Sequence, residues 1–159
     1  MKQLVLVLGI FVSGLLVLSS MSIAQHGGHG AMGSSTMKME TREVLVEGVK
    51  VTFQIMANEE HKKMLKDMKM KEDVEPGTTH NITVTLKDAK TQKEITNAEV
   101  QMKVVDPKGK DQIKELRYED TMKSYDAYFK LPEKGKYQVI VLVKRGNQKI
   151  PAGIYYEIK

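Results

Sequence analysis

Apolar and polar positions alternate with a period of two along most of the chain after residue 42, as in strands that bury one face. The alternating runs cover residues 43–46, 49–56, 80–86, 98–104, 113–118, 125–131, 137–143 and 154–158. Turn residues separate them at intervals of roughly eight to twelve residues, the spacing typical of a β-sandwich. The pattern predicts an all-β fold, an immunoglobulin-like Greek-key β-sandwich of about seven to eight strands.

One segment has a different period. Its apolar and sulfur-containing positions recur three and four residues apart, at His61, Met64, Leu65 and Met68, while lysines occupy the opposite side. With Asn58 as the N-cap, this spacing predicts an amphipathic helix over residues 58–70, inserted in the sandwich and lying against a sheet or its edge.

The N-terminus is typical of a secretory signal: Lys2 precedes the apolar run 4–18, and Ser22-Ile23-Ala24 is a small-x-small cleavage site. We therefore expect a cleaved signal peptide (1–24), a flexible Gly-, His- and Met-containing arm (25–40) and a sandwich domain (41–159). The mature protein would be periplasmic or extracellular, with no transmembrane span after cleavage. An uncleaved anchor extending to Ile23 is the alternative.

Composition excludes several classes of function. The chain has no cysteine, which excludes disulfides, thiolate ligands and a cysteine nucleophile. The net charge of +5 is spread as lysines among acidic residues, and with no Trp and an export signal this argues against nucleic-acid binding. No phosphate-binding loop, metalloprotease motif or Ser-His-Asp set is recognisable, so we expect no catalysis.

The remaining chemistry is that of imidazole and thioether groups. The chain has 11 Met and 4 His, and the arm contains His26 and His29. Mixed His and Met ligands suit copper, so we expect a copper ion as the ligand. Cleavage after Ala24 would also let the new N-terminus and His26 chelate Cu(II). Imidazoles suit nickel and zinc as well, so the arm alone does not select the metal.

A second group of metal-ligand candidates lies on and near the predicted helix. His61, Met64 and Met68 are close enough on a helix to share one ion, and His80, at the start of a strand, is a candidate fourth ligand. Three structural readings stay open. The helical methionines are core fillers, His80 bonds a backbone carbonyl, or the arm is only a linker.

The segments Ala98-x-Val100-x-Met102, Pro107-x-Gly109 and Gly135-x-Tyr137-x-Val139-x-Val141 resemble the YtkA-like family of exported immunoglobulin-like domains, architectural relatives of the CopC-type copper carriers. The resemblance covers residues 79–143 and implies the sandwich fold and an association with copper. It transfers no ligand residue. Tyr137 matches the position of a tyrosine corner, which ties a Greek-key crossover.

Two functions follow as expectations. The first is exported, non-catalytic copper binding or delivery through His and Met side chains. The second is a metal-free accessory module that binds a periplasmic or membrane partner protein through its surface or edge strands. The oligomeric state does not follow from the sequence.

Overall fold

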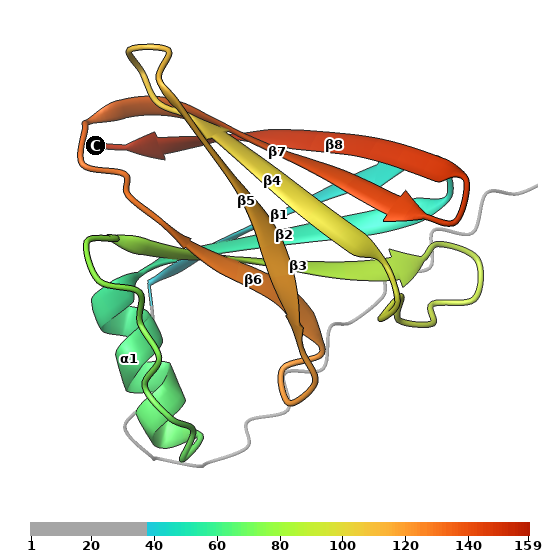
Figure 1. The fold of residues 1–159 in the computed structure, drawn as a ribbon, viewed down its shortest axis with the longest axis horizontal. Coiled ribbons are helices and arrows are strands. Elements are labelled where there is room, and N and C mark those ends of the chain that lie inside the picture. Colours follow the sequence, from blue (N-terminus) through green and yellow to red (C-terminus); the bar gives the residue numbers. More distant parts are fainter. Residues whose placement is uncertain (1–37) are drawn as a thin grey trace, which may run out of the picture. The chain divides into compact units, whose positions relative to one another are not determined.

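The computed structural model describes residues 38–159, which form eight strands and one helix (Figure 1). In chain order these are β1 (Met39–Val46), β2 (Val49–Ala57), α1 (Asn58–Asp67), β3 (His80–Asp88), β4 (Glu99–Val105), β5 (Asp111–Glu119), β6 (Ser124–Phe129), β7 (Gly135–Arg145) and β8 (Gln148–Ile158). The predicted all-β class with a single inserted helix is confirmed. The predicted signal peptide and most of the arm, including His26 and His29, lie outside the described residues.

The strands follow one another in the order β1-β2-β3-β6-β5-β4-β7-β8, and every neighbouring pair is antiparallel. β5 joins two halves of the sheet, because residues 111–116 pair with β4 while residues 117–119 pair with β6. The outermost strands, β1 and β8, contact each other. The sheet is therefore coiled into a nearly closed sandwich (Figure 1).

The core lies between the two halves and consists of the inward positions of the alternating runs. Its largest fully buried apolar side chains include Phe53, Phe129, Ile82, Leu86 and Met102. Strands that bury one face place every second residue in this layer, so the period of two in the sequence is accounted for directly.

Two features of the resemblance have the expected structural roles. The Tyr137 hydroxyl donates to the carbonyl of Glu133 at 2.8 Å and accepts from its N–H at 2.9 Å, which makes the predicted tyrosine corner. The Gly109 N–H donates to the carbonyl of Asp106 at 3.0 Å, closing the predicted turn between β4 and β5.

Helix α1 follows β2 directly and contacts β2 and β3 (Figure 1). Residues 68–79 then lead back to β3, so the helix and this return segment lie outside the sandwich core. Within residues 38–159, no helix combines the length and apolar character needed to cross a bilayer.

Candidate functional site

The start of α1 differs from the prediction. The N-cap is Ala57, no side chain of the described residues caps the helix, and Asn58 is the first helical residue. Asn58 is buried, its backbone N–H donates to the carbonyl of Thr79 at 2.9 Å, and its Nδ2 donates to Thr78 Oγ1 at 2.9 Å. The prediction of Asn58 as the N-cap is wrong because its side chain bonds the segment preceding β3. The helix start is thereby fixed to the sheet.

The helix also ends earlier than predicted, at Asp67 instead of residue 70. Lys69 has a left-handed backbone (φ 55°) and its N–H donates to Lys66 O at 3.0 Å, while the N–H of Met70 donates to Leu65 O at 2.8 Å. These two bonds form a Schellman motif, which satisfies the last carbonyls of a helix and reverses the chain. Met70 therefore lies in the return segment.

The predicted helical stripe divides into a buried and an exposed part. His61 and Leu65 are buried, with 1% and 4% of their surface exposed, whereas Met64 is half-buried and Met68 is 46% exposed. The side of α1 that faces the sheet is thus formed by His61 and Leu65. Met68 therefore belongs to the exposed part of the stripe, whereas His61 belongs to the buried part.

His61 is held by a residue of β6. Its Nδ1 lies 3.0 Å from the hydroxyl oxygen of Tyr128, and the two ring centroids are 5.5 Å apart. Burial lowers the pKa of His61, so the ring is neutral at pH 7. Its Nε2 is buried and has no hydrogen-bond partner in the part of the chain that the structure describes. When the proton is on Nδ1 and is donated to Tyr128, Nε2 has a free lone pair, the state in which histidine binds metals.

His80 lies on the other face of the sheet. It pairs across strands with Phe129, a core residue, whereas Asn81 pairs with Tyr128. His80 Nδ1 is 2.9 Å from Thr79 Oγ1, its ring packs edge-on against Tyr156, and burial lowers its pKa. Since cross-strand partners share a face, the structure does not bring His80 together with His61.

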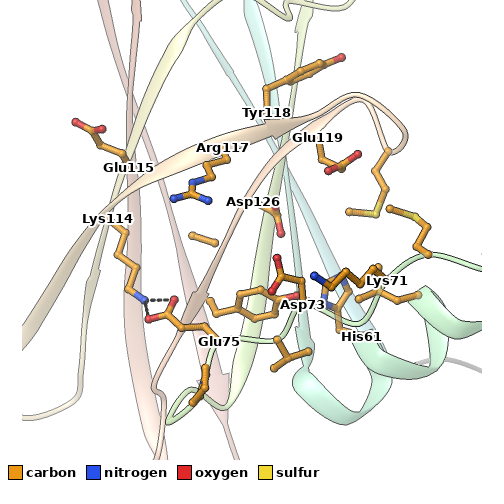
Figure 2. A pocket seen from close by; sticks show the side chains of 17 residues that line it. His61, Lys71, Asp73, Glu75, Lys114, Glu115, Arg117, Tyr118, Glu119 and Asp126 are labelled. Carbon is orange, nitrogen blue, oxygen red and sulfur yellow. Dashed lines mark hydrogen bonds and ion pairs between the residues drawn. The ribbon is translucent and has the colours of Figure 1, made fainter.

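A cleft of about 650 Å³ lies beside His61 (Figure 2). Its wall comes from four parts of the chain: α1, the return segment, β5 with the turn after it, and β6. The lining residues that carry charge are Lys71, Asp73, Glu75, Lys114, Glu115, Arg117, Glu119 and Asp126. Glu75 and Lys114 form an ion pair at 2.7 Å across this cleft. More acidic than basic side chains line it, which favours cations.

A chain of polar groups lies at the base of this site, on the outer face of β3 and β6. Thr83 Oγ1 donates to Asn81 Oδ1 at 2.9 Å, and Asn81 Nδ2 donates to Asp126 Oδ2 at 3.0 Å. Burial, with a smaller contribution from Glu119 and Asp73, raises the pKa of Asp126. Burial and the nearby carboxylates also raise the pKa of Tyr128 to about 12. Tyr128 therefore remains a neutral partner for His61.

Sequence reasoning did not identify Asn81, Asp126 or Tyr128. All three occupy the strand positions that alternate with core residues, which ordinarily face solvent. The missing information was the path of residues 68–79, which no local pattern reveals. Among residues 38–159, no group of three histidine or carboxylate side chains is placed to hold a metal ion.

Comparison with known proteins identifies the fold only. No family model and no curated protein matches this chain. A solved structure of a DUF4426 family protein from Pseudomonas aeruginosa PAO1 is similar, with a TM-score of 0.56 and 14% identity over 74% of this chain and 94% of that one.

Two structures of FetP from uropathogenic Escherichia coli are also similar. A copper-bound variant has a TM-score of 0.53 and 13% identity, covering 77% of this chain and 97% of its own. The protein as isolated after expression in the E. coli periplasm has a TM-score of 0.53 and 12% identity, covering 77% and 95%. This chain thus has the fold of these small proteins.

Proposed function

We propose that this protein is an exported, non-catalytic copper-binding protein that uses histidine and methionine side chains, and that His61 is its anchoring ligand within the sandwich domain. One observation carries the proposal. His61 is almost completely buried, one ring nitrogen contacts Tyr128, and the other has no hydrogen-bond partner within the described residues 38–159. An unbonded buried polar atom costs about 1–3 kcal/mol, and a metal ion would remove that cost.

The available donors favour copper over other metals. Zinc sites are usually built from Cys, His and carboxylates, but the chain has no cysteine, and no three His or carboxylate side chains of residues 38–159 are placed to hold one ion. Thioether and imidazole ligands together suit copper. The similarity in fold to a copper-bound FetP variant supports the same choice, at 13% identity.

The predicted arm is part of the proposal. β1 is antiparallel to β2, and Met39 pairs with Met56, two residues before α1 begins. The chain therefore enters the sandwich domain at the end where α1 starts.

A metal-free accessory module is the second candidate, and the outermost strands favour it. Leu45 on β1 and Tyr155 on β8 expose 69% and 57% of their surface. Exposed apolar residues on terminal strands can bind a partner protein.

Anaerobic titration of residues 25–159 with Cu(I), against a chromophoric chelator, separates the two candidates. We expect His61→Leu to weaken Cu(I) binding by at least about tenfold, and the matched variant His80→Leu to change it by less than about twofold. A loss confined to His26→Ala/His29→Ala would place copper binding in the arm. Absence of binding in the unmodified protein would favour the accessory module.

Export is tested separately. We expect the intact mass of the protein recovered from the periplasm to correspond to a chain beginning at Gln25. A mass that includes residues 1–24 would support the uncleaved anchor.

A further inference from the structure

Three soft or borderline donor side chains line the cleft beside α1. His61 comes from α1, Met70 from the return segment, and Met122 from the turn between β5 and β6. Neither Met64 nor Met68, the helical methionines that the sequence suggested, lines this cleft. The donors that share the cleft therefore come from three separate segments of the chain.

The helix end positions Met70. Its backbone N–H donates to Leu65 O at 2.8 Å, and Leu65 lies one helical turn after His61. Met70 is thereby attached to the helix close to His61 along the chain. Met70 is half-buried. It lines the same cleft as His61, and a methionine side chain is flexible enough to adapt to a ligand.

The β5–β6 turn positions Met122. The N–H of Thr121 donates to Glu119 Oε1 at 3.2 Å, and Lys123 has a left-handed backbone with φ of 51°. Met122 lies between these two residues and is half-buried. It lines the same cleft as His61 and Met70.

The donor set decides which ion fits. No three histidine or carboxylate side chains of residues 38–159 are placed to hold one metal ion, which disfavours zinc and other ions that need nitrogen and oxygen ligands. One imidazole nitrogen with two thioethers instead suits Cu(I). Five carboxylates and three basic side chains line the cleft, and Figure 2 shows both Asp73 and Lys71 close to His61. The lining is therefore acidic on balance, which favours a cation.

We propose that this cleft is a Cu(I) site in which His61 Nε2, Met70 Sδ and Met122 Sδ are the ligands. The assignment rests on the proposed copper function and specifies its ligands. It also explains why the buried Nε2 of His61 has no hydrogen-bond partner among residues 38–159.

The test follows the methionine methyl groups by NMR in residues 25–159 labelled with [¹³C-methyl]methionine. Cu(I) is added under reducing conditions, and Ag(I) serves as its redox-inert substitute. We expect the first equivalent to shift the methyl resonances of Met70 and Met122 and to leave those of Met64 and Met68 in place.

Two matched double variants accompany the labelling. Met70→Leu/Met122→Leu should weaken Cu(I) binding by at least about tenfold, whereas Met64→Leu/Met68→Leu should change it by less than about twofold. Met and Leu have similar volumes, so both variants should fold, and urea unfolding checks this.

The results distinguish this site from the broader proposal. If Cu(I) binds but the Met70 and Met122 resonances do not move, the cleft assignment is wrong while the copper function stands. If Met64 and Met68 respond instead, the helix surface is the site. If neither Cu(I) nor Ag(I) binds, both proposals fail.

Discussion

The two faces of β3 are both buried, but they differ in chemistry. The inner face presents Ile82, Val84 and Leu86, each at most 1% exposed, to an apolar core. The outer face presents Asn81 and Thr83, which are 0% and 6% exposed and belong to a polar chain that ends at Asp126. One strand thus separates a region arranged for stability from a region arranged around polar groups.

The difference indicates where the fold gives up stability. If stability alone determined the packing of α1 and the return segment on the outer face of β3, both surfaces would be apolar. Buried polar groups are favourable only when every one of them is hydrogen-bonded. Here α1 places a histidine with an unbonded nitrogen over that face. Departures of this kind are expected at functional sites.

The largest effect should come from the inner region. Phe53→Ala removes a fully buried ring from β2 and should lower the free energy of unfolding by about 3–5 kcal/mol. Urea unfolding followed by circular dichroism measures this. The control is Ile113→Ala on β5, where 56% of the side chain is exposed, and its effect should stay within about 0.5 kcal/mol. Similar losses in the two variants would contradict the position of the core.

The outer region should respond less strongly and with a dependence on pH. Asn81→Ala leaves Asp126 and Thr83 without their partner and should cost about 1–3 kcal/mol. In the unmodified protein, the hydrogen bond from Asn81 lowers the pKa of Asp126 and so opposes the effect of burial. Removing this bond should raise the pKa of Asp126 further. A carboxyl whose folded pKa is raised stabilises the fold in acid and loses that contribution as pH rises through the folded pKa.

The loss on Asn81→Ala should therefore be larger at pH 7 than at pH 4. The matched control is Thr83→Val, which removes only one bond of the chain and keeps Asn81 bound to Asp126. An equal loss at both pH values would mean that Asp126 is not coupled to Asn81.

The contrast between the two faces also explains what the sequence could predict. The inner faces follow a local rule, alternation with a period of two, which predicts the strands. The turn at Asp106–Gly109 follows from its Asp, Pro and Gly residues, and the corner at Tyr137 is implied by the resemblance to the YtkA-like family. The outer face depends on how residues 68–79 cross the sheet. That path is a tertiary feature, and Asn81 and Asp126 have no local signal that distinguishes them from solvent-facing residues.

The candidate site divides in the same way. The helical spacing correctly indicated a helix and drew attention to His61. It extended the helix to residue 70 because Lys69, which turns the chain, is not the glycine that ordinarily marks such an end. The spacing therefore predicts Met70 on the helix. In the structure Met70 lies in the return segment and lines the same cleft as Met122, a tertiary arrangement that no local pattern indicates.

The buried histidine should make the outer region sensitive to acid. Burial lowers the pKa of His61, so its contribution to stability is complete above about pH 6.5 and is lost as pH falls towards the folded pKa. We expect the urea midpoint of the metal-free protein to fall between pH 7.5 and pH 5, and His61→Leu to reduce that fall.

His80 gives the comparison for this experiment, because burial lowers its pKa on the opposite face of β3. His80→Leu should remove its own share of the acid sensitivity and leave that of His61. If neither variant changes the pH dependence, the titrating groups lie elsewhere in the protein.

The smallest effect should come from the C-terminal end of α1, which belongs to neither face of β3. Lys69 adopts a left-handed backbone that a side chain disfavours, so Lys69→Gly should stabilise the protein by about 0.5–1 kcal/mol. The matched control is Lys66→Gly inside α1, which should destabilise it by a similar amount because glycine is a poor helix former. Thermal unfolding of the two variants measures the difference. Opposite shifts would establish that α1 ends at the Schellman motif, which is the feature that releases Met70 from the helix and brings it to the cleft.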